Sequence, residues 1–403
     1  MKVAIAGAGV GGLALAAMLG RAGHEVTLYD QFETARPVGS GLMIQPVGMA
    51  VLDRIGAGAA ARASGQPIRR MLGLEVEAGR SVLDVAYAPE GAATDRMGLA
   101  IHRASLHAAL LDSAAAAGVG VTTGRRIEAS SICAQGRWLH AGGDRIGPFD
   151  LVVDASGAGS SLSPLVARPL PYGAVWGTVP WPDGTPLPRD QLTQRYRRAD
   201  RMAGVLPVGT MPGREGMQAA IFWSLPAEAF AQWRAAGLVA WKAEAESLWP
   251  DFAPFLESVT EIGQMVPARY SHGSLRRPWG ERIAHIGDAA HRASPQLGQG
   301  ANMALLDALA LSLALGRRSR TDPPGEALAA ALAGHARMRR WHLRLYQGLS
   351  AAFTPQYQSD SRVLPLLRDR FLAPLSQVPP LPQVLARLVA GNLLPPLAGE
   401  AEG

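Results

Sequence analysis

The residues most suited to chemistry lie near the N-terminus, where three glycines follow the spacing Gly7-x-Gly9-x-x-Gly12. They stand between a short apolar run at residues 2–6 and an Ala/Leu-rich segment suited to a helix. In this arrangement the first glycine permits a tight turn, the second lets the backbone approach a pyrophosphate, and the third lets the helix pack on the strand. The helix N-terminus, which includes Gly11, offers free N–H groups to the phosphates. The pattern therefore predicts a dinucleotide-binding site.

An acidic residue follows the glycines at the distance that a ribose contact requires. Asp30 ends a second predicted strand at residues 25–29, and Gln31 comes directly after it. A carboxylate in this position accepts hydrogen bonds from a ribose hydroxyl group. Residues 1–23 also resemble a signal peptide, but a βαβ unit explains both the glycines and the acid. This motif alone does not distinguish FAD from NAD.

A second motif spans residues 287–302, which read GDAAHRASPQLGQGAN. It resembles the Gly-Asp motif of the FAD-dependent aromatic hydroxylases, the para-hydroxybenzoate hydroxylase family of group A flavoprotein monooxygenases. The resemblance implies that a strand delivers Asp288 to the ribityl chain of FAD. It also implies a helix opening at 298–302, whose N–H groups stabilise the negative charge of reduced flavin. The cofactor contacts implied here are Gly287, Asp288, Pro295, Gly298, Gly300, Ala301 and Asn302.

The resemblance extends along nearly the whole chain. Arg103 opens a predicted helix after a strand at 99–102, where the family places an arginine on the flavin or its phosphates; a surface arginine is the alternative. The segment at 39–46 resembles the one beside the isoalloxazine ring, where Gly41 would let the backbone approach; an ordinary turn is the alternative. The remaining cofactor contacts assigned from the resemblance are Ile127, Ser156 and Gly157.

One motif departs from the family pattern. Residues 154–163 read DASGAGSSLS, so Ser156 stands in place of an aspartate and Ser163 in place of an arginine. In the family this motif takes part in both flavin and nicotinamide handling, and a hydroxyl cannot replace either charge. FAD binding is still expected, whereas the case for NAD(P)H use is weakened. The Asp-Ala-Ser-Gly sequence at 154–157 also resembles the corresponding motif of flavin-dependent halogenases and prenyl-chain reductases. Halogenases of this type need a lysine between the flavin and substrate pockets, and neither Lys2 nor Lys242 is well placed for that role.

The resemblance implies a single-component monooxygenase that uses FAD, with O2 and NAD(P)H as co-substrates. It would hydroxylate a small aromatic or heteroaromatic molecule through a flavin C4a-hydroperoxide, while the protein excludes water and holds the ring close. A flavin reductase or dehydrogenase without oxygen insertion, and a non-catalytic FAD-binding protein, stay open as alternatives. Tyr196 or His272 is a candidate for assisting deprotonation, with packing as the alternative for both. The residues expected at the substrate are Pro295, Gln45, Tyr196, Trp223 and His272, with Tyr270 on the same wall.

The elements that must position these residues predict an α/β fold, with a Rossmann-like FAD-binding domain interleaved with an antiparallel-sheet substrate domain and a helical C-terminus. Further strands are predicted at 119–123, 132–139, 151–153 and 283–286. Alternating runs rich in Pro, Gly and Trp at 169–226 indicate the antiparallel sheet. After a helix at 300–315 the chain is mostly helical, broken by Pro355 and Pro379-Pro380. We assign FAD-binding parts to 1–68, 99–168 and 273–345, substrate-domain parts to 69–98 and 169–272, and a C-terminal helical segment to 346–403.

Composition narrows the function further. The 403 residues are 48% hydrophobic and 18% charged, which is typical of a globular chain of two or three domains. The net charge is +6, but the arginines are scattered, so no nucleic-acid partner is expected. Cys133 is the single cysteine, and no apolar run of spanning length follows the N-terminus, so we expect a cytoplasmic monomer or homodimer without stable membrane insertion. No metal is predicted, since a strand followed by a turn would not bring His285, Asp288 and His291 together.

Overall fold

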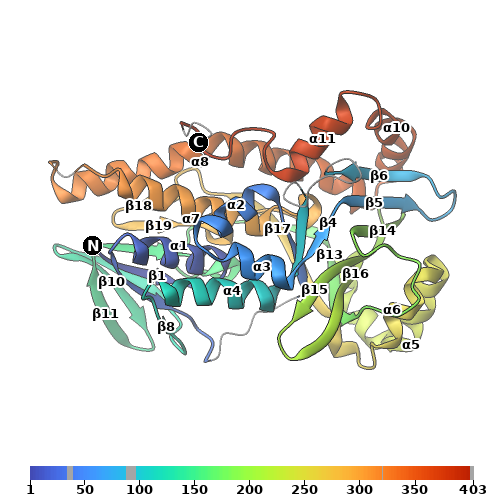
Figure 1. The fold of residues 1–403 in the computed structure, drawn as a ribbon, viewed down its shortest axis with the longest axis horizontal. Helices are drawn as coiled ribbons and strands as arrows, with labels where there is room; N and C mark the ends of the chain where they lie inside the picture. The colour runs from blue at the N-terminus through green and yellow to red at the C-terminus, as the bar shows by residue number, and fades with distance from the viewer. Residues whose placement is uncertain (34–39, 88–96, 320, 400–403) are drawn as a thin grey trace.

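The computed structural model describes residues 1–33, 40–87, 97–319 and 321–399. Figure 1 shows two halves side by side: an α/β half that contains the N-terminus, and an antiparallel half flanked by α5 and α6. The long helix α8 (Pro324–Tyr357) runs along one edge of the α/β half and reaches the antiparallel half. The mixed α/β architecture with a helical C-terminus agrees with the expectation from sequence.

A six-stranded sheet forms the centre of the α/β half. Its order is β18-β19-β12-β1-β2-β8, and all neighbours are parallel except the β18–β19 pair. Alternate side chains of β1 point to opposite faces, so Val3 and Ile5 pack against the helices while Ala4 and Ala6 face a small sheet. The strands are β1 (Lys2–Ala6), β2 (Glu25–Tyr29), β8 (Val121–Thr122), β12 (Leu151–Asp154), β18 (Trp279–Gly280) and β19 (Ile283–His285).

Three helices cover one face of this sheet and a small antiparallel sheet covers the other. The helices are α1 (Val10–Arg21), α4 (Arg103–Ala116) and α7 (Gly300–Gly316), whose apolar residues join the main core. The small sheet contains β9 (Ala129–Cys133), β10 (Gly136–Ala141) and β11 (Asp144–Phe149). Short elements between the halves are β3 (Gly41–Ile44), α2 (Pro46–Arg54), α3 (Gly58–Ser64), β4 (Gln66–Ile68) and β7 (Gly98–His102).

An eight-stranded sheet forms the antiparallel half, in the order β20-β17-β13-β16-β15-β14-β5-β6. Its neighbours are antiparallel except for β14 and β5, which run parallel. One face packs against α5 (Phe230–Leu248) and α6 (Ala253–Glu257), and the other faces the α/β half. The strands are β5 (Arg70–Glu75), β6 (Ser81–Ala86), β13 (Arg168–Pro180), β14 (Gln191–Arg197), β15 (Arg201–Met211), β16 (Arg214–Pro226), β17 (Val266–Ser274) and β20 (His291–Arg292).

Local structure differs from the sequence expectation at two places. The strand expected at 132–139 is a hairpin, with β9 ending at Cys133 and β10 beginning at Gly136, because a two-residue turn interrupts the apolar run. Pro355 does not break the helix that precedes it. It lies in the last turn of α8, which continues to Tyr357. After α8 come α9 (Val363–Leu367), a π-helical turn (Arg368–Leu372), α10 (Ala373–Leu375) and α11 (Leu381–Ala390).

Trp223 lies on the opposite face of the eight-stranded sheet from the one expected. Successive residues of a strand point to opposite faces, and in β16 it is Phe222 whose side chain faces the α/β half. Trp223 instead belongs to the core beneath α5 and α6, where it is 1% exposed. It therefore stabilises the antiparallel half on the side of α5 and α6 and does not face the α/β half.

We expect Trp223→Ala to lower the free energy of unfolding by about 3–5 kcal/mol, because it removes a large buried side chain and leaves a cavity. Chemical denaturation of the purified protein measures this. The control is Val239→Ala in α5, where the side chain is 85% exposed and little change is expected. Equal stability of the two variants would contradict the placement of Trp223 in this core.

Candidate active site

The glycines of the first motif are fixed by close backbone contacts. Gly7 has φ +105°, and a Cβ there would lie 2.5 Å from the carbonyl oxygen of Ala155. A Cβ on Gly12 would collide with the carbonyl oxygen of Gly7, so helix α1 meets the loop without a side chain between them. Gly9, in contrast, is exposed, and nothing lies within 4 Å of a Cβ there. No side chain of the described residues caps α1 at Gly9, so its first N–H groups could meet phosphate oxygens.

Asp30 couples the end of β2 to this loop. Its carboxylate accepts the N–H of Ala8 at 2.8 Å through Oδ2 and that of Phe32 at 3.0 Å through Oδ1. A carboxylate has about four acceptor positions, so capacity remains for a ribose hydroxyl. Gln31 is exposed beside it. The predicted adenosine-binding edge is thus both positioned and still able to accept hydrogen bonds.

Asp307 of α7 bonds two residues of the second motif on its buried side. The sequence motif did not indicate this residue. Its Oδ2 accepts the N–H of Gly287 at 3.0 Å and faces Nε2 of His291 at 2.6 Å, while its Oδ1 accepts Nε of Arg339 at 2.8 Å. Asp307 is 2% exposed and Arg339 is 1% exposed. Burial alone would raise the pKa of Asp307, but His291 and Arg339 hold it below its usual value. The anchored loop leaves Asp288 exposed on the open side.

The N-terminus of α7 provides further open donors. Gly298 has φ +60°, in the left-handed region, and Gly300 is exposed at the start of the helix. The N-cap residue, Gln299, makes no side-chain cap, so the N–H groups around Gly300 and Ala301 are free to meet a ligand. The positive end of the helix dipole therefore points into this open space, where it would stabilise negative charge on a bound ligand.

Asn302 has a positioning role in this arrangement. Its buried amide oxygen accepts the N–H of Gln45 at 2.8 Å, and its Nδ2 donates to the carbonyl oxygens of Met43 and Gly298. These bonds fasten the segment between β3 and α2 to the second motif. Its side-chain amide is occupied by these bonds, so any cofactor contact from Asn302 would come from its backbone.

Gln45 presents an unpaired buried donor beside this helix end. Its side-chain carbonyl accepts the hydroxyl of Tyr87 at 2.6 Å, but its Nε2 has no hydrogen-bond partner among the described residues. Nε2 lies 3.3 Å from the position of a Cβ on Gly298. A buried polar atom without a partner is costly, and a carbonyl oxygen of a flavin pyrimidine ring would satisfy it. The residues present therefore fit FAD.

Arg103 faces the same space. Its side chain is exposed, and desolvation by the surrounding protein lowers its pKa, while the nearby Asp288 carboxylate and the Tyr270 hydroxyl oppose this shift. No ion pair to Arg103 is found within the part of the chain that the structure describes. Gly41 does not open toward this space. Its missing side chain makes room for Val208 of the eight-stranded sheet.

The face of the eight-stranded sheet that looks toward the flavin loops is aromatic. Nε1 of Trp176 donates to the hydroxyl of Tyr270 at 2.8 Å, and the rings of Trp176 and Phe222 lie 4.6 Å apart. Burial raises the pKa of Tyr270 to about 12, with the bond from Trp176 and the charge of Arg103 opposing, so its phenol stays neutral. Trp176 and Phe222 were not predicted. They are paired across β13 and β16, and the two-residue alternation of these strands indicates them once the buried face is known.

A series of hydrogen-bond contacts connects His272 with Ser294, the residue before Pro295. Ser294, next to Pro295, has its hydroxyl 3.0 Å from that of Ser350 in α8, which lies 3.4 Å from Nε2 of His272. Pro295 is exposed. Desolvation and then the charge of Arg168 lower the pKa of His272, which favours a neutral ring that can accept a proton. The structure thus brings these two predicted residues into one region.

Tyr196 is enclosed in the protein core. It is 1% exposed, and its ring centroid lies 5.4 Å from that of Tyr357 and 5.3 Å from the guanidinium carbon of Arg368. Burial raises its pKa well above the usual value, so the phenolate is strongly disfavoured. The expectation that Tyr196 assists deprotonation is therefore replaced by a packing role, because the C-terminal elements cover this end of the sheet.

The altered loop at 154–163 is organised around Asp154, which is 0% exposed. Its carboxylate accepts the hydroxyls of Ser156 and Ser160 and pairs with Nδ1 of His285 at 2.8 Å. Ser163 donates to the carbonyl oxygen of Ala289, which ties this loop to the second motif. The acid thus lies two residues before the position that the family pattern gives it. Ser156 is exposed, Gly157 is half-buried, and Ile127 is buried against the small sheet.

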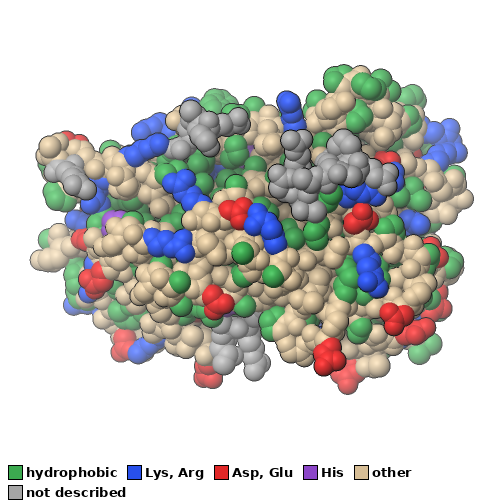
Figure 2. All heavy atoms as spheres, viewed as in Figure 1, with side chains coloured by type: hydrophobic (Ala, Val, Ile, Leu, Met, Phe, Trp, Pro, Cys, Tyr) green, Lys and Arg blue, Asp and Glu red, His purple; other side chains and the backbone are tan. Residues whose placement is uncertain are grey.

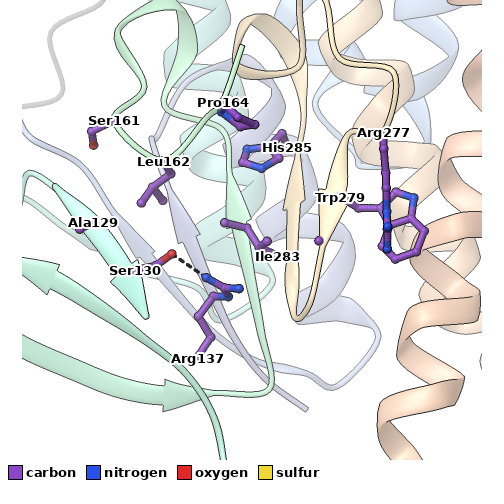
Figure 3. Close-up of a pocket in the computed structure, with 11 residues that line it drawn as sticks. Ala129, Ser130, Arg137, Ser161, Leu162, Pro164, Arg277, Trp279, Ile283 and His285 are labelled. Carbon is purple, nitrogen blue, oxygen red and sulfur yellow. Dashed lines mark hydrogen bonds between the residues drawn. The ribbon is translucent and has the colours of Figure 1, made fainter. Parts of the chain in front are cut away.

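A hollow of about 460 Å³ lies on the small-sheet side of the six-stranded sheet, and Figure 3 shows the residues that line it. His285 lines it next to Pro164, with Arg137 on one side and Arg277 stacked on Trp279 on the other. His285 is bonded to Asp154, His291 to Asp307, and Asp288 is exposed elsewhere. These three possible ligands therefore do not converge, and the described residues contain no group of three metal-ligating side chains.

We expect Asp288→Ala to weaken FAD affinity by roughly 1–3 kcal/mol, because it removes an acceptor from the ribityl chain. Titration of the flavin-free protein, followed by flavin fluorescence, measures this. Asp183→Ala, which removes an exposed carboxylate from the loop between β13 and β14, is the control. Unchanged affinity in Asp288→Ala would show that this loop does not hold the cofactor.

The buried histidine behind the anchor predicts a pH dependence. Burial lowers the pKa of His335 to about 4 from an ordinary 6.5, and the Asp307 charge opposes the shift. The unfolded chain therefore takes up a proton first as pH falls, and stability is lost from about pH 6.5 down to about 4. We expect His335→Gln to flatten part of this loss, measured as the free energy of unfolding across that range. An unchanged slope would contradict it.

The sequence matches the family described as FAD binding domain over residues 1–136 and 205–338. It is 28% identical to the FAD-dependent urate hydroxylase of Klebsiella pneumoniae over 77% of this chain and 80% of that protein. It is 26% identical to the 3-amino-4-hydroxybenzoate 2-monooxygenase of Streptomyces cremeus over 77% of each chain.

Solved structures share the fold. Klebsiella pneumoniae HpxO complexed with FAD and uric acid superposes with a TM-score of 0.77 at 21% identity, covering 97% of both chains. Pseudomonas aeruginosa PqsL in complex with 2-aminobenzoylacetate gives a TM-score of 0.75 at 23% identity, covering 89% of this chain and 96% of that one. The two glycine motifs, the free helix N-termini and these matches lead to one conclusion: the chain belongs to the FAD binding domain family and is an FAD-dependent monooxygenase.

Proposed function

We propose that this monooxygenase hydroxylates a small, planar aromatic or heteroaromatic molecule, with O2 and NAD(P)H as co-substrates. The observation that carries the proposal is the aromatic pair of Trp176 and Tyr270, with Phe222 buried behind Trp176, near Arg103 and the loop that contains Asp288. Aromatic rings pack favourably against one another in offset or edge-on arrangements. The names of the relatives, which describe hydroxylation of ring compounds such as urate and an aminohydroxybenzoate, agree with this substrate class.

The bound FAD would supply the oxygen chemistry, and the protein would position it. Asp288 would hold the ribityl chain, and the free N–H groups at Gly300 and Ala301 would face the flavin pyrimidine edge. Nε2 of Gln45, which lacks a partner among the described residues, would donate to a ring carbonyl there. These donors are fixed before the cofactor arrives, which limits the reorganisation that electrostatic stabilisation requires.

Tyr270 is suited to orient the substrate. Its oxygen accepts a hydrogen bond from Trp176, and its hydroxyl has no acceptor among the described residues, so its hydrogen could be donated to a ring substituent. Its raised pKa keeps that hydrogen in place at neutral pH. His272 is suited to accept a proton, since its ring is kept neutral and its Nε2 is linked through Ser350 to the loop of Pro295.

Oxygen uptake tests the function directly. NAD(P)H oxidation and oxygen consumption are followed with FAD-loaded protein over a panel of aromatic acids, purines and pyridines, and hydroxylated product is identified by mass spectrometry. We expect slow oxidation alone and faster oxidation with the right ring compound. Reduction with no oxygen in the product would favour a reductase or dehydrogenase. No reduction by NAD(P)H, with normal reduction by dithionite, would favour a non-catalytic FAD-binding protein.

We expect Tyr270→Phe to raise KM for the aromatic substrate by about 2–10-fold, because it removes one hydrogen bond to the ring substituent. FAD affinity should stay unchanged. The matched control is Tyr172→Phe, which removes a hydroxyl that donates to Asp360 in the same half of the molecule. An equal effect of the two variants on KM would show that Tyr270 acts through stability alone.

A further inference from the structure

The C-terminal segment exposes an unusual number of large apolar side chains. Of the fifteen that are exposed among the described residues, nine lie between Val363 and Leu394. The remaining six are spread over the rest of the chain. Figure 2 shows hydrophobic side chains gathered at the upper right of this view, over α10. The exposed residues that form this C-terminal apolar face are Val363, Leu366, Leu367, Phe371, Leu372, Leu375 and Val378.

These apolar side chains point toward solvent, whereas those of an ordinary surface helix point toward the core. Helical structure runs without a break from Val363 to Leu375, through α9, the π-helical turn and α10. Its buried positions are Pro365, Arg368 and Ala373, whereas Phe371 is 65% exposed. A surface helix normally turns its apolar stripe toward the core. Here the leucines and Phe371 point outward, as expected for a surface that something else covers.

The segment is firmly attached to the protein. Arg368 is 1% exposed, and its guanidinium donates to Asp369 at 2.6 Å and to the carbonyl oxygens of Gln356 and Arg198. Its guanidinium carbon also lies over the rings of Tyr196 and Tyr357. The exposed apolar face is therefore part of the folded structure and not a loose tail.

The charges around this face are positive. Arg362 and Arg370 are exposed beside and within this segment, Arg387 is exposed in α11, and none of the three has an ion pair within the described ranges. Between Val363 and Val378 the single acidic residue is Asp369, which is paired with Arg368, and the exposed Asp360 before the segment accepts the hydroxyl of Tyr172. Apolar side chains bordered by arginines are typical of a segment that lies in the interface of a lipid bilayer.

We propose that the C-terminal apolar face docks on an anionic lipid surface, with Phe371, Leu375 and their neighbours entering the acyl boundary and the arginines meeting the headgroups. A second copy of this chain fits less well. In a two-fold interface each patch meets itself, which would bring the arginines of two copies together without free carboxylates in the segment. No helix in the described ranges is long and apolar enough to span a bilayer, so the contact is one of adsorption.

Vesicle sedimentation tests the proposal. FAD-loaded protein is mixed at low salt with vesicles of phosphatidylcholine alone, or of equal parts phosphatidylcholine and phosphatidylglycerol. We expect binding to the anionic vesicles, weaker binding to the neutral ones, and a decrease with added salt. The double variant Phe371→Ser/Leu375→Ser should lower the partition coefficient at least about tenfold, since two apolar side chains no longer leave water. Retained flavin and an unchanged melting temperature show that this variant is folded.

The matched control is Val166→Ser/Val239→Ser, which changes two side chains that are 94% and 85% exposed outside the face. It should bind vesicles like the unchanged protein. Light scattering is measured in parallel. A dimer that dissociates in the Phe371→Ser/Leu375→Ser variant, with no vesicle binding, would show that a second copy covers the face and overturn the proposal. Absence of binding, or binding that both double variants retain equally, would overturn it as well.

Discussion

The buried carboxylate of Asp307 is the interaction on which the flavin site depends. It joins the N–H of Gly287, the ring of His291 and the guanidinium of Arg339, and so connects the second motif to α7 and α8. Burying these charges costs free energy, which the mutual pairing offsets only while all partners are in place. These bonds tie the loop to α7 and α8, and a preorganised cofactor site requires groups that are fixed in this way. Asp307 therefore helps to position both Asp288, which follows Gly287, and the N-terminus of α7.

A second constraint is the close contact between the two halves of the molecule. Gly41 of β3 lies against Val208 and Ala220 of the eight-stranded sheet, where a side chain would collide with its neighbours. Asn302 fastens the following segment to the second motif through Gln45 and Met43. The aromatic face of the large sheet is thereby held opposite the loops for the cofactor, and residues distant in the chain form one site.

The loop at 154–163 shows how a motif can change in composition and still be structurally integrated. The family's aspartate and arginine are absent at 156 and 163, but both serines take part in defined hydrogen bonds. Asp154 gathers Ser156, Ser160 and His285 around a carboxylate whose pKa is lowered by these partners, although its burial acts in the opposite direction. The loop is therefore built around Asp154, a buried acid on the small-sheet side. The family's aspartate would instead stand at position 156, which is exposed.

The sequence alone determined the parts of this protein that consist of neighbouring residues. The two glycine motifs, the acid after β2 and the alternating strands are local patterns, and local backbone requirements fix them. Which residues meet across the chain was decided by the tertiary structure. Trp223 and Phe222 are adjacent in the sequence, yet only strand pairing decides that Trp223 faces α5 and α6 while Phe222 lies on the opposite face of the sheet. Asp307 lies in a helix of apolar residues, and its partners come from 20 residues before and 32 residues after it. Tyr196 lost its expected role because α8 and the C-terminal segment cover it, and such long-range packing leaves no periodic signal in the sequence.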